Sequence, residues 1–198
     1  MGLREMNATR TREHLTTVSL RLFREHGYDG TTMEDVAQAA EVGLSTLYRY
    51  FPTKEQLAVA YLGDPDLMAR ALRARPQDES PEASLGEALV AFVEHAQRDV
   101  EQAATFTEVA DGQPRVRARL LEWLADAHVQ LTAALAERRG VEPHDLHAAA
   151  SAWLVVLVLQ TMSEEQERTG HERPPVEVAR DIMARLGRHE ILPPRSAP

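Results

Sequence analysis

The stretch from Thr32 to Lys54 restricts the fold of this chain more than any other segment, because two short helical patterns and the start of a third helix follow one another within 23 residues. Thr32 is a predicted N-cap, and Asp35 suits the positive end of the helix that it opens. Apolar residues then recur at the i, i+3, i+4 and i+7 spacing of one helical face. They are Met33, Val36, Ala37 and Ala40. This narrow stripe predicts close packing against another helix.

Two flanking segments supply apolar partners for the stripe. Upstream, residues with the same helical spacing precede Gly27, which stands where a helix C-cap glycine is expected. The upstream set is Leu15, Val18, Leu22 and Phe23, and the downstream set is Val42, Leu47 and Phe51. With these faces buried in a three-helix core, a second short helix over residues 44–50 would present small, hydroxylated and cationic groups outward. Such a surface fits the major groove of DNA.

Lys54 follows Thr53, a predicted N-cap that can form a capping box with Gln56. A lysine in the first turn lies at the positive end of its helix, which is unfavourable unless an anion is near. A DNA phosphate would supply that anion. Because Lys54 is the only lysine among 22 basic residues, we expect it to have a function there as a phosphate ligand.

The segment from Leu22 to Leu57 resembles the N-terminal DNA-binding domain of the TetR family of bacterial transcriptional repressors. The matching positions are Phe23, Gly27, Tyr28, Thr31, Thr32, Val36, Ala37, Val42, Thr46, Leu47, Tyr48, Tyr50, Phe51, Lys54 and Leu57. The resemblance implies that the chain binds double-stranded DNA. The residues expected to contact DNA are Arg10, Arg12, Thr32, Gly43, Leu44, Ser45, Thr46, Tyr48, Arg49, Tyr50 and Lys54.

Three positions depart from the family pattern. The family usually has glycine where this chain has Glu41, and serine where it has Gly43. Glycine in place of a serine cap costs only a few tenths of a kcal/mol, whereas a non-glycine residue in a left-handed turn costs roughly 1–2 kcal/mol. We therefore expect a redrawn turn between the two short helices, not a lost one. The third position, Leu44, is often basic in relatives and here predicts apolar contact with a thymine methyl group.

Beyond this segment the chain has helical patterns and no strand alternation, so the predicted fold class is all-α: an N-terminal three-helix helix-turn-helix domain followed by a helical-bundle effector and dimerisation domain. The predicted boundaries are residues 1–62 and 63–198. Residues 63–80, with their glycine, prolines and polar side chains, are a hinge candidate. The next helix should start after Ser80, with Pro81 at its first position. Further helices are predicted over residues 99–110, 114–139, 143–168 and 175–187.

Charge and cysteine content narrow the protein class. The formal net charge is −9, of which residues 1–62 carry −1, so overall basicity is not evidence for DNA binding. The DNA hypothesis depends instead on the clustering of cations in the N-terminal arm and the second short helix. The absence of cysteine excludes disulfides and thiolate metal sites. Because the start has neither a signal-peptide pattern nor an apolar run of membrane length, we expect a cytoplasmic protein without a membrane partner.

The segment from Ala148 to Met162 is nearly apolar on all sides, and such a helix is expected to be buried on all sides. Neighbouring helices of one bundle could bury it. The family resemblance implies the other possibility, a homodimer in which the last two long helices of each chain form a four-helix interface. It assigns to this interface Trp153, Leu154, Leu157, Val158, Val178, Ile182 and Leu186.

The resemblance also implies a small-molecule effector of unknown identity, bound in the bundle of residues 85–165. Only four of the ten aromatic residues lie beyond residue 62, which argues against an aromatic cage for a cationic ligand. A mostly aliphatic pocket with one or two polar groups is expected. Its candidate residues are Phe92, His95, Phe106, Trp123 and His128. A purely structural position in the core or on the surface is the other interpretation for each of them.

Together these inferences predict a ligand-responsive transcriptional regulator, in the first instance a repressor, that binds a palindromic operator as a dimer and is released by its effector. The alternative is a helical ligand-binding or interaction protein that keeps the fold without specific DNA binding. The sequence contains no nucleophile elbow, phosphate-binding loop or metal-ligand set with motif spacing. We therefore expect no enzymatic activity, no catalytic residue, no metal and no cofactor.

Overall fold

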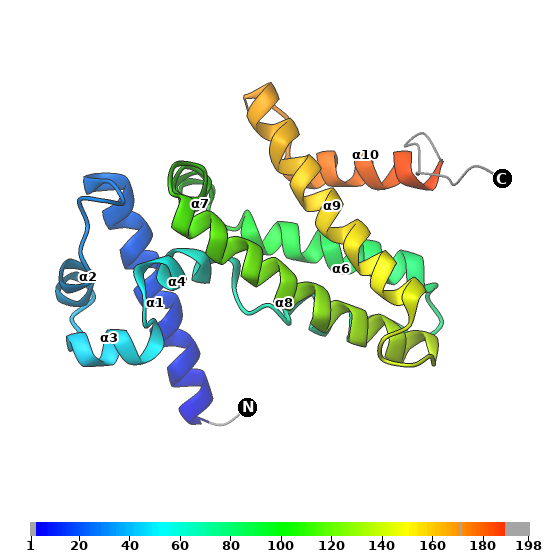
Figure 1. The fold of residues 1–198 in the computed structure, drawn as a ribbon, viewed down its shortest axis with the longest axis horizontal. Helices are drawn as coiled ribbons and strands as arrows, with labels where there is room; N and C mark the ends of the chain where they lie inside the picture. Colours follow the sequence, from blue (N-terminus) through cyan, green and yellow to red (C-terminus); the bar gives the residue numbers. More distant parts are fainter. Residues whose placement is uncertain (1–2, 171, 189–198) are drawn as a thin grey trace. The chain divides into compact units, whose positions relative to one another are not determined.

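The computed structural model describes residues 3–170 and 172–188, and every regular element in these ranges is helical. Figure 1 shows the helices in chain order. They are α1 (Leu3–His26), α2 (Met33–Ala39), α3 (Leu44–Tyr50), α4 (Lys54–Val59), a short 3-10 helix (Ala60–Leu62), α5 (Leu67–Arg73), α6 (Pro81–Ala96), α7 (Val100–Gly112), α8 (Pro114–Arg139), α9 (Leu146–Thr169) and α10 (Pro175–Gly187). The all-α prediction is confirmed.

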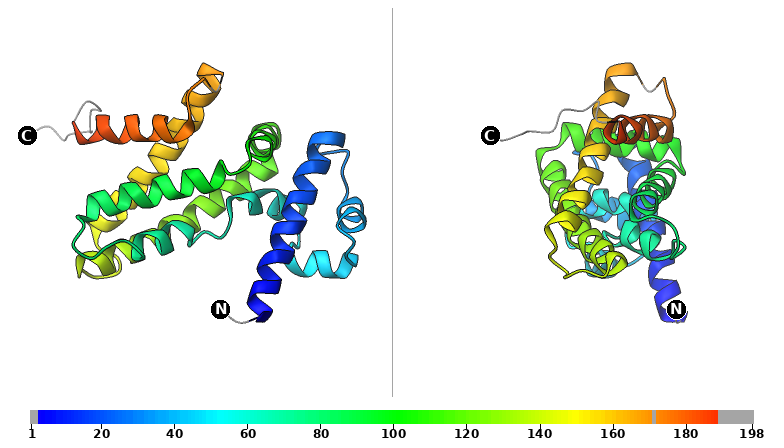
Figure 2. Two further views of the ribbon diagram at one scale, coloured as in Figure 1. Left: turned by 180° about the vertical axis from the view of Figure 1, so that it is seen from behind. Right: turned by 90° about the vertical axis from the view of Figure 1, so that its right-hand side faces the viewer.

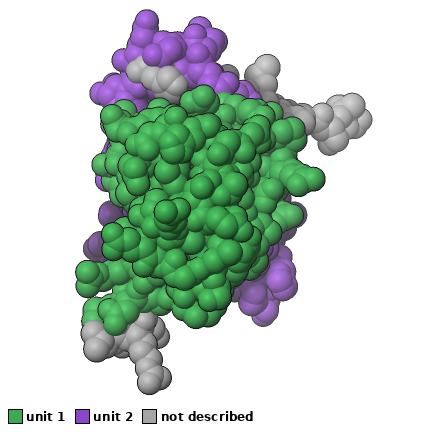
Figure 3. Space-filling view, turned by 90° about the vertical axis from the view of Figure 1, so that its left-hand side faces the viewer, with its two compact units in different colours: residues 1–65, 98–125 green, residues 66–97, 126–198 purple. Residues whose placement is uncertain are grey.

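The chain divides into two compact units. Unit 1 contains Met1–Pro65 and Arg98–Ala125, and unit 2 contains Asp66–Gln97 and Asp126–Pro198. Figure 3 shows unit 1 as one continuous surface, although its two stretches are far apart in the sequence. This division differs from the predicted boundary at residue 62, because α7 packs on α1 and α4.

The core of the first three helices contains most of the apolar residues predicted for it; of the others, Val42 is partly buried against it and Phe23 is buried beside Tyr28. Helices α2 and α3 lie on the same side of α1 in Figure 1 and in the left view of Figure 2, where α2 packs on α1 and α3 packs on α2. The buried cluster comprises Leu15, Val18, Leu22, Met33, Val36, Ala37, Ala40, Leu47, Phe51 and Leu57. Because the stripe on α2 consists mainly of small side chains, α2 can approach α1 closely.

Helix α7 and the start of α8 extend the core of unit 1. The ring of Tyr61, which is 1% exposed, lies with its centroid 5.5 Å from that of Phe106 on α7. The Tyr61 hydroxyl donates to the carbonyl oxygen of Asp99 at 3.4 Å. On α8, the indole Nε1–H of Trp123 donates to the carbonyl oxygen of Gly63 at 2.9 Å. These contacts explain why residues 98–125 belong with the N-terminal helices.

Unit 2 contains a helix that the sequence prediction missed. Residues 63–80 were expected to form a polar hinge, but α5 occupies their middle, with Met68, Ala69 and Leu72 buried. The helix has only seven residues. Such a short helix gains most of its stability from tertiary packing, which leaves a weak local signal.

Most helix ends in the rest of the chain lie close to their predicted positions. The predicted start of α6 is confirmed, since the Ser80 hydroxyl accepts the amide N–H of Ala83 and Pro81 occupies the first turn. The bounds of α8 and α10 agree with the predicted 114–139 and 175–187. Helix α9 starts three residues later than predicted, because the Asp145 carboxylate caps it by accepting the amide N–H of Ala148 at 2.9 Å.

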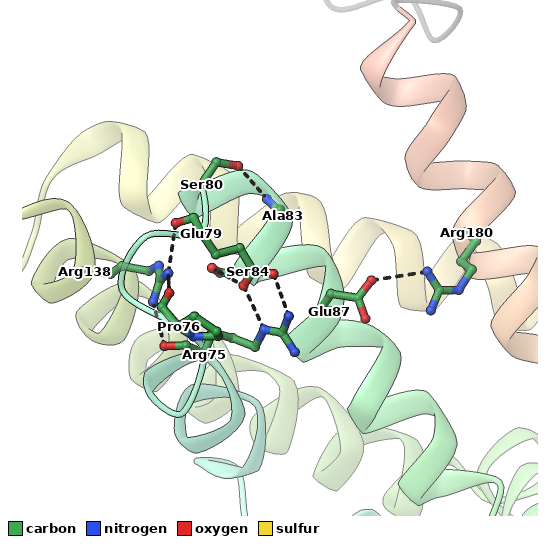
Figure 4. A network of polar contacts seen from close by, with 9 residues as sticks. All are labelled: Arg75, Pro76, Glu79, Ser80, Ala83, Ser84, Glu87, Arg138 and Arg180. Atoms are coloured by element: carbon green, nitrogen blue, oxygen red, sulfur yellow. Dashed lines mark hydrogen bonds and ion pairs between the residues drawn. The ribbon is translucent and has the colours of Figure 1, made fainter.

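The loop between α5 and α6 is fixed by a network of polar side chains (Figure 4). The Glu79 carboxylate accepts from the guanidinium of Arg75 at 2.5 and 2.8 Å and from the hydroxyl of Ser84 at 2.7 Å. These hydrogen bonds, first that of Arg75, lower the pKa of Glu79 to about 2. On α8, Arg138 donates to the carbonyl oxygens of Arg75, Pro76 and Glu79. The loop is therefore held by Ser84 of α6 and Arg138 of α8, and by the pair of Arg75 and Glu79 within it.

Candidate nucleic-acid interface

The start of α2 is fixed by a reciprocal capping box. The Thr32 hydroxyl oxygen accepts the amide N–H of Asp35 at 3.1 Å, and the Asp35 carboxylate accepts the amide N–H of Thr32 at 2.8 Å. The Thr32 hydroxyl also donates to that carboxylate at 2.6 Å, which is the main reason that the pKa of Asp35 lies below its ordinary value. The predicted N-cap is confirmed, and the Thr32 side chain is committed to local bonds.

The turn after α2 keeps its geometry although it lacks glycine. Glu41 has φ 56, in the left-handed region. The amide N–H of Glu41 donates to the carbonyl oxygen of Gln38 at 3.1 Å, and that of Val42 donates to Ala37 at 3.0 Å. These two bonds form a Schellman motif, which ends α2 and lets α3 begin in a new direction. A redrawn turn was expected, and the structure shows instead the ordinary one with a non-glycine residue in it.

Helix α3 has one buried side, which packs on the core, and one exposed side. Leu47 is 0% exposed and anchors the helix to the core. Gly43 is the exposed N-cap and Thr46 is half-buried. The exposed edge of α3 consists of Ser45, Tyr48 and Arg49. Because Tyr48 and Arg49 follow Ser45 by three and four residues, both lie beside Ser45 on the helix surface.

Two residues predicted to point outward from α3 do not do so. Leu44 and Tyr50 are partly buried and pack against the core cluster. The reason is helical spacing, since Leu44 precedes Leu47 by three positions and Tyr50 follows it by three, which places all three on the core side. The Arg49 guanidinium lies 5.4 Å from the centroid of the Tyr50 ring. The proposed contact of Leu44 with a thymine methyl group therefore loses its basis.

The cations near the N-terminus lie on α1, which is helical from Leu3. Arg10 and Arg12 are both exposed. The guanidinium of Arg12 lies 5.0 Å from the centroid of the Phe51 ring, at the end of α3. A cation–π contact of this kind holds the arginine beside the end of α3.

Lys54 has partners within its own chain. Its Nζ donates to the carbonyl oxygens of Tyr28 at 2.6 Å and Thr31 at 2.8 Å, and lies 4.0 Å from the centroid of the Tyr28 ring. Lys54 therefore does not require a DNA phosphate as was expected, because the partial negative charges of two main-chain carbonyl oxygens already lie beside its ammonium group. Thr53 caps α4 as predicted, by accepting the amide N–H of Gln56 at 3.2 Å.

Comparison with protein families agrees with this geometry. Residues 15–61 match the family of bacterial regulatory proteins called the tetR family, and residues 79–189 match the family described as the MftR C-terminal domain. The transcriptional regulator TcmR of Streptomyces glaucescens is 30% identical over 152 residues, which cover 73% of this chain and 67% of TcmR. The chain belongs to the TetR family of transcriptional regulators. DNA binding through the helix-turn-helix is the shared function of that family.

Solved structures of TetR-family proteins share the fold at low sequence identity. FadR of Thermus thermophilus, solved with lauroyl-CoA, has a TM-score of 0.58 and 20% identity, over 94% of this chain and 98% of that one. FadR of Bacillus subtilis, solved with stearoyl-CoA, has a TM-score of 0.59 and 13% identity, over 88% and 96% of the two chains. The sequence alone did not assign the C-terminal part to a subfamily, and the MftR match now describes it.

In this TetR-family chain, α9 carries an exposed apolar face. Trp153, Leu154 and Leu157 are 52%, 47% and 41% exposed, and Leu146, one heptad before Trp153, is 77% exposed. We call these four residues the α9 face. Within the described residues, α9 is the one helix long and apolar enough to cross a membrane by length and composition, and 28% of its apolar window is buried. The expectation that this helix is buried on all sides is therefore wrong for the single chain.

Three of the residues predicted for the dimer interface lie in the core of unit 2 instead. Val158 and Val178 are each 2% exposed, and Ile182 is 8% exposed. Their side chains are covered because α10 packs on α9 and α6 within the same chain. Leu186, near the end of α10, is half-buried. Val158, Val178 and Ile182 therefore stabilise the fold of the single chain. Of the residues predicted for the interface, the large exposed ones are Trp153, Leu154 and Leu157 on α9.

The five residues predicted for the effector divide between the two units. Phe106 and Trp123 belong to unit 1, where their contacts with Tyr61 and Gly63 are structural. Phe92, His95 and His128 belong to unit 2. His128 lies 3.1 Å from the carbonyl oxygen of Ala149 through Nε2, and its ring stacks on that of Trp153 with centroids 4.1 Å apart. An effector role for these residues stays a prediction.

The sequence analysis missed the two acceptors of Lys54 and one residue of the α9 face. The carbonyl groups of Tyr28 and Thr31 carry no sequence signal, since every residue has one. Leu146 did have a signal, because it lies seven residues before Trp153 on the same helical face.

Proposed function

We propose that this chain is a ligand-responsive transcriptional repressor that binds a palindromic operator as a homodimer and leaves it when a small-molecule effector binds. The observation that carries the proposal is the exposed edge of α3, which projects from a helix anchored by the buried Leu47. Base reading requires hydrogen-bonding groups on a rigid support, because ordering a mobile element on binding costs entropy. Membership of the TetR family supports the DNA-binding activity itself.

The chemistry of the exposed edge suggests a division of roles on DNA. Arg49 offers a planar fork that matches O6 and N7 of guanine, and the Ser45 hydroxyl can donate or accept at several bases. Tyr48 adds a hydroxyl on an aromatic ring. Arg10 and Arg12 on α1 provide charges for phosphates, which contribute affinity that does not depend on sequence. The exposed N-cap Gly43 leaves room for close approach of the sugar-phosphate backbone.

A dimer is proposed through the α9 face. Covering apolar surface stabilises a contact by about 25 cal/mol per Å², and each copy offers the same four side chains to its partner, as a two-fold interface requires. Two recognition helices about 34–36 Å apart would then meet successive major grooves of a palindrome. A single copy would read only half of such a site.

The proposed effector is an apolar or amphipathic small molecule. Two structures with this fold were solved with lauroyl-CoA and stearoyl-CoA. With only four aromatic residues beyond residue 62, the C-terminal bundle offers mainly aliphatic side chains, which suit an acyl chain. Effector binding would favour the spacing of recognition helices that does not fit the operator. A coupling of about 1–3 kcal/mol lowers operator affinity 5- to 150-fold. These events would take place in the cytoplasm, where DNA is accessible.

The test is a footprint of the full-length protein on the DNA upstream of its own gene. We expect protection of two half-sites about 10 base pairs apart. Arg49→Gln should reduce the preference for this site over random DNA by about tenfold or more. Arg21→Gln, which removes a cation paired with Glu25 on α1, is the control and should leave the preference unchanged.

Two results would contradict the proposal. A folded protein that protects no DNA would favour the alternative, a ligand-binding protein that has kept the fold without specific DNA binding. A complex that is insensitive to fatty acyl-CoA thioesters, while a co-purified ligand of another class releases it, would overturn the proposed effector class and leave the DNA-binding role intact.

A further inference from the structure

Lys54 joins the first turn of α4 to the loop between α1 and α2. Its ammonium group has three N–H donors. Two of them reach the carbonyl oxygens of Tyr28 and Thr31, at 2.6 and 2.8 Å. The charge also lies 4.0 Å from the centroid of the Tyr28 ring. With these partners the ammonium group is directed into its own domain.

The loop that receives Lys54 determines where α2 begins. The Tyr28 carbonyl oxygen also accepts the amide N–H of Thr31 at 3.2 Å, which closes a turn. Gly30 in this turn has no room for a side chain, because a Cβ atom would clash with the carbonyl oxygen of His26. The Thr31 hydroxyl donates to the carbonyl oxygens of Gly27 and Leu22, at 2.9 and 3.2 Å. The next residue, Thr32, is the N-cap of α2.

The surroundings of Lys54 are those of a structural cation. Lys54 is half-buried, and burial lowers its pKa, while the carboxylates of Asp29 and Glu55 act in the opposite direction. The Tyr28 ring that it faces packs on Phe23 of α1, with centroids 5.0 Å apart. A lysine that served only to bind a DNA phosphate would not need two main-chain acceptors in its own domain.

We propose that Lys54 is a positioning residue for DNA binding: it clamps the turn of residues 28–31 to α4 and thereby fixes the start of α2 and the direction of α3, without contacting a phosphate itself. The clamp ties α2 and α4 together at their N-terminal ends. The helix-turn-helix and α4 then move as one body when the protein changes state. This inference depends on the DNA-binding role proposed above only for its effect on affinity.

Two substitutions separate the clamp from a phosphate contact in the full-length protein. Lys54→Met removes the charge and keeps the length of the side chain. Lys54→Arg keeps a positive charge that can reach a phosphate, but a planar guanidinium cannot occupy the same point between two carbonyls and an aromatic ring. Arg10→Gln serves as the comparison for loss of an exposed cation from α1.

The first measurement is hydrogen exchange of the free protein, which needs no operator. We expect amide exchange of residues 28–36 to become at least about tenfold faster in both Lys54 variants, since charge-assisted hydrogen bonds are lost. Arg10→Gln should leave it unchanged. Unchanged exchange in both Lys54 variants would overturn the clamp, whether or not the protein binds DNA.

The second measurement is the salt dependence of binding to the upstream DNA. Each lost phosphate contact lowers the slope of log affinity against log salt by about 0.9. We expect both Lys54 variants to bind at least about tenfold more weakly with an unchanged slope, whereas Arg10→Gln should lower the slope. A reduced slope for Lys54→Met, with wild-type slope and affinity for Lys54→Arg, would identify Lys54 as a phosphate ligand and refute the proposal.

Discussion

The amide N–H of Val42 donates to the carbonyl oxygen of Ala37 at 3.0 Å, closing the end of α2 around Glu41, whose φ is 56. Glycine adopts this left-handed conformation without the penalty of a Cβ atom. We expect Glu41→Gly to stabilise the protein by about 0.5–1 kcal/mol, the relief of strain less the greater freedom of glycine in the unfolded chain. Urea unfolding measures this change.

Glu41→Ala is the control for this prediction, because it removes the charge and keeps the strained conformation. It should have little effect on the urea midpoint. If both variants were equally stabilised, the gain would come from removal of a negative charge and not from the backbone.

The hydroxyl of Tyr28 is buried and has no hydrogen-bond partner among the described residues, and burial raises its pKa. A buried unpaired polar group costs about 1–3 kcal/mol. We therefore expect Tyr28→Phe to raise the melting temperature by about 2–4 °C, as followed by circular dichroism. Tyr61→Phe is the matched comparison, since its hydroxyl donates to the carbonyl oxygen of Asp99, and it should lower the melting temperature. The same response in both variants would contradict the explanation.

Glu79 should give part of the stability a dependence on acid pH. Its pKa is about 2 in the folded protein, against an ordinary 4.5, first because of its hydrogen bonds with Arg75. A carboxyl with a lowered pKa in the folded state stabilises the fold fully above pH 4.5, and this contribution is lost as the pH falls towards 2. The urea midpoint of Glu79→Gln should therefore approach that of the wild type as the pH falls between these values. Parallel curves for the two proteins would show that Glu79 makes no such contribution.

The α9 face predicts how the protein associates. Leu157→Asp should convert a dimer into a monomer at micromolar concentration, because a leucine is worth about 1.5–3 kcal/mol when buried and each interface contains two copies. Sedimentation equilibrium measures the result. Val100→Asp is the control, since Val100 is 73% exposed on α7, outside the α9 face. A wild-type protein that is monomeric would contradict both the assignment and the proposed dimer.

The core of the N-terminal helices and several helix starts were predictable because their signals are local. Thr32 and Ser80 cap the helices that follow them, and a capping bond spans only three residues. The apolar spacing on α1 and α2 likewise identified the buried side of each helix. The left-handed conformation of Glu41 was not predicted. The family pattern showed only that this position usually holds glycine, and a redrawn turn was expected there.

The errors concern properties that depend on distant parts of the chain. The acceptors of Lys54 lie 23 and 26 residues before it, so the charge at the start of α4 looked unpaired. Leu44 looked outward because a helix of seven residues can turn several faces to the core, and only the packed structure shows which. The apolar character of Val178 and Ile182 predicts that they are buried. It does not show whether they pack against helices of the same chain or against a partner chain.

The exposed α9 face has a consequence for how a cell would use this protein. If operator reading requires two copies joined through this face, the concentration of active species follows the square of the protomer concentration wherever dimers dissociate, so that halving the protein lowers the dimer about fourfold. Expression of the target genes would then respond to protein level as a threshold. Dilution of the regulator by growth and division would then derepress such a gene as effectively as an effector does.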